Sequence, residues 1–513
     1  MEYRQNSERT AKAEFDRLDG DRQGLLYRYE RLAQLTIPSI FTAKEYRTEQ
    51  DQLTNGFTSL GGQCVTHLTN KLMNAMFAPS RPFFRLGMAA AELKTIAAQL
   101  GVEEGVITDS LSAGERDAMS ELEREGCREA LYEGVTNLVA VGNVLMDMSG
   151  DNLQFVSVRD YVVRRNAKSV PTCIIIKECV RYDDLEDDAQ QNYSAVRGTC
   201  EDYTELHTYK QIKLVKGMYR ESFWVEDVDL GPKYSGKYKP ENLPYRALTW
   251  RLPLRQHYGV GRAEEYANDL ATNDGLSEAQ ADGAILASQF KWLVSPSGMT
   301  RPEDLSGSQN GAVIPGVEGD LALAYANIGQ QLQTVLAISQ DYQRRLGAGF
   351  LLSSAVTRDA ERVTAEEIKI QVMELESSLG GVYSRLALSI QQPLALWLIR
   401  KAKINIKGTK ITPTIITGLD AISRNGDLER MRAFLGDAAQ LDNIQPATRA
   451  KLNENNIISD MAAGNGVDKG RYILPPEQQQ ANQDKADVEA LGRQSAMNQV
   501  DTATLPQDQR ATA

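Results

Sequence analysis

The chain has 513 residues, which at roughly 100–200 residues per domain suggests about three folding units. Hydrophobic residues make up 42% and charged residues 25% of it, as in globular proteins with a substantial core, so collagen-like, mucin-like and wholly disordered classes are excluded. The formal charge of −12, from 57 basic and 69 acidic residues, disfavours tight static binding to DNA phosphates but leaves brief or sliding contact open.

The N-terminal segment is polar and lacks the apolar core of a signal peptide. No stretch supplies the roughly 20 mostly apolar residues that a bilayer span needs, so no membrane segment is expected. The cysteines form no CxxC pair, which supports neither a disulfide framework nor a zinc site, and buried thiols in a reducing compartment are expected instead. They are Cys64, Cys127, Cys173, Cys179 and Cys200.

Residues 1–150 are predicted to be mostly helical. Apolar residues at helical spacing predict a helix that is stopped by Pro38, a second over 65–76, and a third over 130–141. A turn at Gly142-Asn143 should follow the third helix.

Residues 151–252 change in character. Short runs rich in Val, Ile, Tyr, Thr and Trp alternate with turn formers, which predicts a mostly antiparallel β region. The runs are FVSVRDYVVRR, TCIIIKECV, YTELHTYKQIKLV, GMYRESFWVEDV and YRALTWRL.

The segment after the β region predicts two long helices joined by a small insert. Apolar and small residues step by three and four over 262–289 and again over 328–346. The insert between them is rich in Pro and Gly, with strand-like ends at 292–294 and 312–314. Two long helices that lead to and from a small tip suggest a stalk, and the small residues on the first helix, Gly283 among them, permit close helix–helix approach.

A linker over 347–363 follows the second helix and is expected to expose Phe350-Leu351-Leu352. Thr364 with Glu367 forms a capping box, T-x-x-E, which begins a strong helix of about eight turns. Its expected kink points are Gly380-Gly381 and Pro393.

The C-terminal part predicts shorter helices over 411–470. From 474 the chain becomes Gln-rich and nearly free of aromatic residues. Such a segment lacks the apolar surface to offset its ordering entropy, so we expect a flexible tail or one that orders only on assembly.

Motifs that carry catalytic chemistry are missing from the sequence. It contains no GxxxxGK[ST], no HExxH and no GxSxG, and its histidines, His67, His207 and His257, are far apart. Acidic runs at 183–188 and 226–229 offer oxygen ligands for a hard cation, but exposed acidic turns are the preferred interpretation. We therefore expect neither a metal site nor a cofactor.

Several stretches resemble, in the same order, the portal proteins of short-tailed phages (podoviruses), which are also called head-to-tail connectors. The longest is LLSSAVTRDAERVTAEEIKIQVMELESSLGGVYSRL at 351–386, and the similarity extends over about residues 25–425. The other stretches are LTIPSIF (35–41), GGQCVTHLTNKLMNAMFAPSRPFFRL (61–86), LVAVGNVLM (138–146), VSVRDYVVRRNA (156–167) and YGVGRAEEYANDL (258–270).

The resemblance implies an α+β, mainly helical fold, the viral portal fold, assembled as a ring of usually twelve subunits at one capsid vertex. A terminase motor would pump duplex DNA in through the ring, and the DNA would leave by the same route. By this resemblance the parts are a wing (1–260, with the β region 151–252), a first stem helix (261–289), a clip (290–327), a second stem helix (328–346), a channel or tunnel loop (347–363), a long kinked wing and crown helix (364–410), crown helices (411–473) and a tail (474–513).

The resemblance also implies a set of partners. They are other copies of the chain, the duplex genome bound without sequence specificity, the terminase large subunit, scaffolding and major capsid proteins, tail adaptor or nozzle proteins, and internal core or ejection proteins, but no membrane. The chain would be made in the host cytoplasm and would reside in the virion at the portal vertex. It would not be an enzyme.

Candidate site residues follow from the same assignment. The channel loop would contribute Phe350, Leu351, Leu352, Ser353, Ser354, Ala355 and Val356, whose apolar and hydroxyl side chains suit a surface that grips DNA without directional bonds. Basic candidates that would face DNA are Arg344, Arg345, Arg358 and Arg362. Clip candidates for docking terminase or adaptor are Trp292, Ser297, Met299, Arg301, Glu303 and Asp304.

Alternatives remain open at this stage. The loop's apolar residues could pack back onto the stem, and each arginine could pair with a nearby carboxylate. A metal-dependent nuclease or hydrolase that uses the acidic runs, and a membrane pore or adhesin, are the competing functions. An acidic channel wall would favour the portal, because duplex DNA carries one negative charge per about 1.7 Å and a basic wall would stall its movement.

Overall fold

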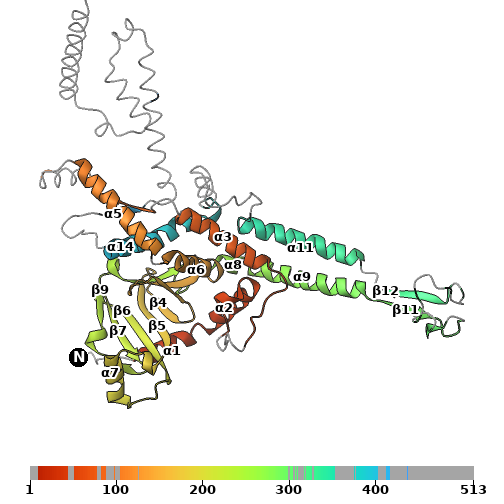
Figure 1. Cartoon of the computed structure of the whole chain (residues 1–513), viewed down its shortest axis with the longest axis horizontal. Coiled ribbons are helices and arrows are strands. Elements are labelled where there is room, and N and C mark those ends of the chain that lie inside the picture. The colour runs from red at the N-terminus through yellow and green to blue at the C-terminus, as the bar shows by residue number, and fades with distance from the viewer. Residues whose placement is uncertain are drawn as a thin grey trace, which may run out of the picture. The chain divides into compact units, whose positions relative to one another are not determined.

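The computed structural model describes residues 10–43, 51–77, 83–87, 104–124, 126–298, 301–303, 319–325, 329–352, 377–402 and 412–415, with a few isolated positions besides. The chain divides into two units, residues 1–418 and 419–513, and every helix and strand described below belongs to the first (Figure 1). Within these described residues, no helix is both long enough and apolar enough to cross a membrane.

Helices dominate the described part of the chain before the β region. They are α1 (Ala11–Gly20), α2 (Gln23–Leu35), α3 (Leu60–Met76), α5 (Glu104–Arg124) and α6 (Cys127–Ala140), with a 3-10 turn at Pro38–Ile40. The helical predictions for this region are confirmed, including the stop before Pro38. Apolar residues of α3 recur every three or four positions and are buried where α3 packs on α6, as the helical period requires.

The β region forms antiparallel sheets, as predicted. A three-stranded sheet has the order β10-β2-β3, and a larger sheet has the order β4-β5-β6-β7-β8 with β9 paired to β7. The strands are β2 (Asn143–Asp147), β3 (Gln154–Ser157), β4 (Tyr161–Arg165), β5 (Pro171–Arg181), β6 (Glu205–Val215), β7 (Met218–Val225), β8 (Val228–Asp229), β9 (Gly236–Tyr238) and β10 (Tyr245–Thr249). Strand β2 was not predicted, because its run of apolar residues continues the pattern of α6.

The larger sheet is buried on both faces near its middle. Ile174 and Ile176 of β5 belong to the main core, whereas Ile175 between them faces α1. There the ring of Phe15 packs edge-on against Tyr209 at 5.7 Å between centroids. Alternate residues of a strand point to opposite faces, and both faces of β5 are buried near its middle. The sequence there is therefore a continuous apolar run.

A small helical insertion joins β5 to β6. It consists of a 3-10 turn, η2 (Tyr182–Asp184), and α7 (Asp187–Arg197), which bury a separate small core against β6, β7 and β8. The sequence predicted an acidic turn over 183–188. The acidic side chains are exposed as predicted, but a helix begins at Asp187, where carboxylates favour the first turn of a helix.

A long helical hairpin follows the β region. Its elements are α8 (Arg262–Glu265), α9 (Ala267–Ser288), β11 (Phe290–Val294), β12 (Leu321–Tyr325) and α11 (Gly329–Gly349), with α9 and α11 side by side (Figure 1). The strand β12, which pairs with β11, was not predicted. Of the strand expected at 312–314, only residue 313 is among the described residues, and it is not in a strand. The second helix also continues beyond 346, to Gly349.

The C-terminal helical region differs from the prediction. The described helices are α13 (Val382–Leu386), a π-helix η6 (Ala387–Gln391) and α14 (Gln392–Lys401). Positive φ values of 57° and 78° at Gly380 and Gly381 interrupt the helix, whereas a kink had been expected there. Pro393 lies in the first turn of α14, directly after the π-helix, a position that a proline tolerates.

A short strand ends the described chain. Residues Thr412–Ile415 form β13, which pairs with β1 (Phe84–Gly87), so the helices expected from 411 do not begin there. The rest of the predicted crown, 416–473, and the tail, 474–513, lie outside the described residues apart from one isolated position.

Candidate functional site

Residues at the seam, where α9 and α11 contact each other, determine how closely and in which register the two helices pack. A Cβ built on Gly283 would lie 2.5 Å from Leu332 Cδ2, so any larger residue at this close approach has to displace the end of that leucine side chain. Nearer the base, Ser339 Oγ donates to Asn273 Oδ1 at 3.3 Å, and both residues are buried. A buried polar pair between two packed helices disfavours slipped registers.

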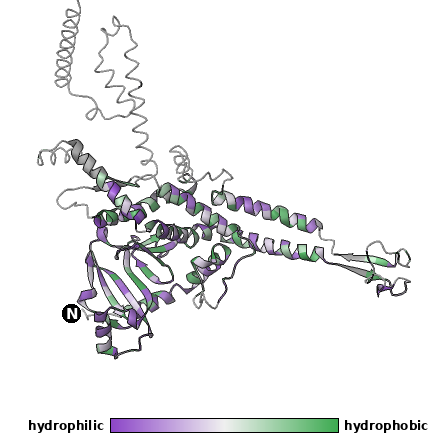
Figure 2. Ribbon diagram, viewed as in Figure 1, coloured by the Kyte–Doolittle hydropathy of each residue, from purple (hydrophilic) through white to green (hydrophobic). Residues whose placement is uncertain are grey.

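The outer sides of the hairpin remain exposed in the single chain. Large apolar side chains are exposed on α9, where Ile285 is 58% and Leu286 51% exposed, and on α11, where Leu336 is 47% and Ile338 45% exposed. Figure 2 shows hydrophobic and hydrophilic residues interspersed along both helices. This distribution contrasts with the single apolar stripe of a helix that packs on only one side.

The basic candidates near the end of α11 differ in their surroundings. Arg345 pairs with Asp341 at 3.3 Å, one turn earlier on the helix, and lies over the Tyr342 ring at 4.1 Å from its centroid. Arg344 is exposed and has no ion-pair partner among the described residues. The other two candidates, Arg358 and Arg362, lie outside the described residues.

The start of the predicted channel loop is packed, not exposed. Phe350 is fully buried and Leu351 is 8% exposed, and the Phe350 ring lies 5.4 Å from that of Tyr266. The expected exposure of these two residues is therefore wrong, and they follow the alternative in which they pack back onto the stem. The remaining loop candidates, Ser353, Ser354, Ala355 and Val356, lie outside the described residues.

The predicted clip residues lie in and after the two-stranded sheet. Trp292 is the central residue of β11 and pairs in register with Leu323 of β12. Ser297, Arg301 and Glu303 are exposed. Met299 and Asp304 lie outside the described residues.

A buried asparagine that sequence reasoning missed joins the main core to the base of the hairpin. Asn143 is 1% exposed, accepts from the Gly259 N–H at 2.7 Å and donates to the Gly259 carbonyl at 2.8 Å. It also donates to the Tyr29 hydroxyl at 2.6 Å, and burial raises the pKa of Tyr29, so that hydroxyl stays protonated. The signal in the sequence was a lone amide between apolar residues, VGNVL, in one of the stretches that carried the resemblance.

The acidic runs are engaged in surface ion pairs. Burial alone would raise the pKa of Glu226, but the Lys12 ammonium at 2.6 Å and the N–H of His207 hold that pKa below its ordinary value. Asp227 lies 3.6 Å from Arg197. No cluster of His, Cys, Asp and Glu in the described part of the chain is arranged to hold a metal ion.

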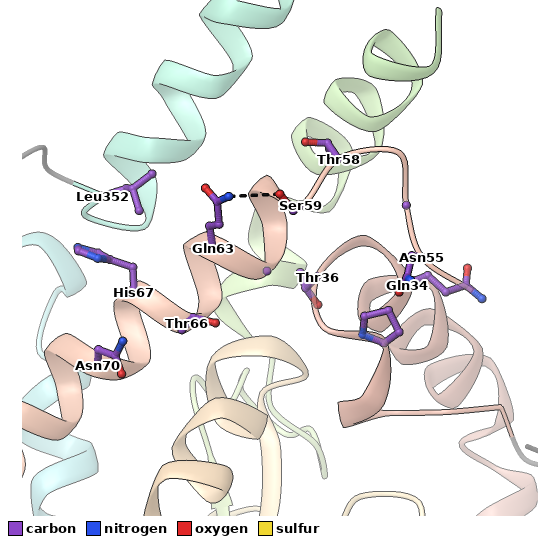
Figure 3. Close-up of a pocket in the computed structure, with 13 residues that line it drawn as sticks. Gln34, Thr36, Asn55, Thr58, Ser59, Gln63, Thr66, His67, Asn70 and Leu352 are labelled. Atoms are coloured by element: carbon purple, nitrogen blue, oxygen red, sulfur yellow. Dashed lines mark hydrogen bonds between the residues drawn. The ribbon is translucent and has the colours of Figure 1, made fainter. Parts of the chain in front are cut away.

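A cavity of about 690 Å³ lies between α3, the end of α2 with the turn that follows it, and the segment 55–59 (Figure 3). Amides, hydroxyls and one imidazole line it, and no charged side chain is among the lining residues, so it suits neither a phosphate nor a cation. Figure 3 shows Gln63, Thr66, His67 and Asn70 along α3, with Leu352 beside them. The predicted channel loop leaves α11 next to this cavity.

Comparison with known proteins establishes the family. The model for bacteriophage head to tail connecting proteins matches residues 8–473. The portal protein of Enterobacteria phage T3 is 30% identical over 485 residues, which is 92% of this chain and 89% of that protein, and the portal protein of Enterobacteria phage SP6 is 30% identical over 426 residues, 82% and 81%. The chain belongs to the family of bacteriophage head-to-tail connecting proteins, which confirms the resemblance seen in the sequence.

A solved structure is also similar to the chain. It is the neck of an empty GTA particle, with a TM-score of 0.40 and 12% sequence identity, over 80% of this chain and 90% of that one.

Proposed function

We propose that this chain is the portal of a short-tailed phage: copies of it close into a ring, of twelve subunits, at one capsid vertex, and duplex DNA passes through the ring during packaging and ejection. The family match over residues 8–473 supports this role. The single structural observation that supports assembly into a ring is the hairpin of α9 and α11, which exposes apolar side chains on two different outer sides.

The placement of these apolar residues favours head-to-tail contact. Ile285 lies two positions after Gly283, about 200° round the helix, and so on the far side of α9 from α11. Ile338 directly precedes the buried Ser339, about 100° away from the seam. The α9 side of one copy therefore meets the α11 side of the next, a heterologous contact that closes into a ring when the rotation allows it.

The parts of the ring follow from the resemblance to portal proteins. The helices and sheets up to residue 260 form the wing, α9 and α11 form the stem, and β11 and β12 belong to the clip. The exposed Ser297, Arg301 and Glu303 are then available to the terminase large subunit and, after packaging, to tail adaptor proteins. The channel loop, expected over 347–363, corresponds to the segment at and after the end of α11.

The charge suits a conduit in which DNA moves. The chain carries a net charge of −12, which repels the duplex from the wall, while a sparse ring of cations centres it. Arg344 is the best candidate for that ring, since Arg345 is held by Asp341. The role is structural and not enzymatic, and energy for DNA movement comes from a separate terminase.

Location and further partners follow from this role. The chain is made in the host cytoplasm, assembles with scaffolding and major capsid proteins, and remains at the portal vertex of the virion. Internal core or ejection proteins contact the ring from inside the capsid.

The test is the mass and image of the purified full-length chain, by analytical ultracentrifugation and negative-stain microscopy. Wild-type chain should form rings with a central hole near the width of duplex DNA, and Ile285→Asp should abolish them. Val196→Asp is the matched control, because Val196 is similarly exposed, at 67%, but lies on α7, away from the hairpin. Single chains under every condition that permits procapsid formation would disprove the proposal.

A further inference from the structure

The end of α11 adopts a conformation that its sequence disfavours. Leu352 N–H donates to the Gly347 carbonyl at 2.7 Å and Leu351 N–H to the Ala348 carbonyl at 3.2 Å, the pair of bonds that caps a helix in the Schellman motif. This motif places Leu351 in the left-handed region, with φ of 57°. Glycine usually occupies that position, and a bulky residue there is strained.

Residues from the first turns of the hairpin hold this strained end in place. Arg262 of α8 donates to the Gly349 carbonyl from Nη2 at 2.8 Å and from Nε at 3.2 Å. A cation that binds a carbonyl at the C-terminus of a helix also complements the helix dipole. The guanidinium is only 16% exposed and lies over the Tyr266 ring, 4.8 Å from its centroid.

The packing leaves little freedom around this contact. A Cβ on Gly349 would lie 2.6 Å from the Tyr266 ring, so glycine is required there. Phe350 packs on the other part of the same ring. Glu265 orients Arg262 through an ion pair of 2.8 Å. The end of α11 is thus clamped between one arginine and one tyrosine, while its own backbone at Leu351 favours release.

We propose that Arg262 is a positioning residue for the channel loop: it holds the strained cap at Leu351 closed and so sets the point and direction at which the chain leaves the stem. The proposal rests on the proposed portal function, since the loop has a role only there. Loss of the arginine releases the cap, and the loop base then opens and closes on its own.

Hydrogen exchange of the assembled full-length ring tests the proposal. Arg262→Ala should leave rings intact by microscopy but speed exchange of the 350–352 amides by about 5-fold or more, and Arg262→Lys should restore part of the protection. Genome retention in particles that carry Arg262→Ala should fall. Exchange within about 2-fold of wild type in Arg262→Ala would overturn the proposal.

A matched pair at Leu351 separates strain from packing. Leu351→Gly and Leu351→Ala remove the same side chain, but only glycine adopts the left-handed region freely. The 350–352 amides should exchange about 5- to 30-fold more slowly in Leu351→Gly than in Leu351→Ala. This ratio corresponds to the roughly 1–2 kcal/mol cost of the left-handed conformation for a residue other than glycine. In the Arg262→Ala background, Leu351→Gly should bring protection back toward wild type, which a merely structural role of the arginine does not predict. Equal rates for glycine and alanine would refute the strain argument.

The outcomes also separate this proposal from the function on which it rests. If the wild-type chain forms no rings, the portal assignment fails. If rings form and Arg262→Ala leaves the 350–352 amides protected, only the positioning role fails.

Discussion

Replacing Asn143 with alanine should destabilise the wing and hairpin base more than any substitution on the surface. The side chain accepts one hydrogen bond from Gly259 N–H and donates to the carbonyl of the same residue and to the Tyr29 hydroxyl. Alanine leaves the buried Gly259 N–H without an acceptor, at a cost of about 1–3 kcal/mol, and removes donated bonds worth about 0.5–1.5 kcal/mol each. The expected loss is about 2–6 kcal/mol, a large part of the roughly 5–15 kcal/mol that stabilises a typical domain.

Urea denaturation followed by circular dichroism measures this loss, and hydrogen exchange at the Gly259 amide reports on it locally. Asn152→Ala is the control, because Asn152 is exposed in the turn before β3 and its replacement should change stability by less than about 0.5 kcal/mol. A loss below about 1 kcal/mol in Asn143→Ala, with Gly259 exchange unchanged, would refute the claim that this side chain holds the two regions together.

Other predictions concern the packing of α9 against α11, the ion pair of Glu226, and the two arginines near the end of α11. Gly283→Leu should cost about 1–3 kcal/mol through overpacking between α9 and α11, and negative-stain images should show no rings. Gly275 has open space around it in the single chain, so Gly275→Leu should instead stabilise that chain by about 1 kcal/mol through higher helix propensity. Normal rings in Gly283→Leu would contradict the placement of Gly283 at the contact with α11. The pKa of Glu226 is lower in the folded chain than in the unfolded chain. Its carboxylate therefore stabilises the fold at pH values above the unfolded-state pKa, and this stabilisation is lost as the pH falls through the folded-state pKa. Glu226→Gln should therefore be less stable than wild type at pH 7, and thermal melts should show this deficit shrinking below pH 4.5; a constant deficit would argue against the ion pair. Arg344→Ala should reduce in vitro packaging several-fold in rings of normal appearance, and Arg345→Ala less so; equal effects would remove the distinction between them.

The parts of the fold that could be predicted depend on local patterns. The stop of α2 before Pro38 and the strands of the β region follow from the fixed φ of proline and from β-branched residues in short runs. The helices of the hairpin follow from apolar residues at helical spacing. Each of these signals lies within one element and needs no information about its partner.

The parts that were missed depend on partners far along the chain. Strand β12, with the sequence LALAY, was not predicted, because a short apolar run carries no sign of its partner and only pairing with β11 identifies it. The pairing of β1 with β13 joins segments on either side of the whole β region and the hairpin, and no local pattern encodes it. At the candidate site, Gly347 and Gly349 indicated an early loop, but both belong to α11, where Gly349 packs closely against Tyr266 and Gly347 against Leu352.

One short segment of chain connects the buried Asn143 with the strained end of α11 at Leu351. The segment 259–262 presents its backbone at Gly259 to Asn143 and its side chain at Arg262 to the end of α11. Three residues span at most about 11 Å when fully extended, so the two contacts cannot move independently by more than a fraction of that length. A shift of the core around Asn143 therefore reaches the carbonyl of Gly349 through this short segment. Coupling between that core and the end of α11 needs no long pathway, because one short segment bonds to both.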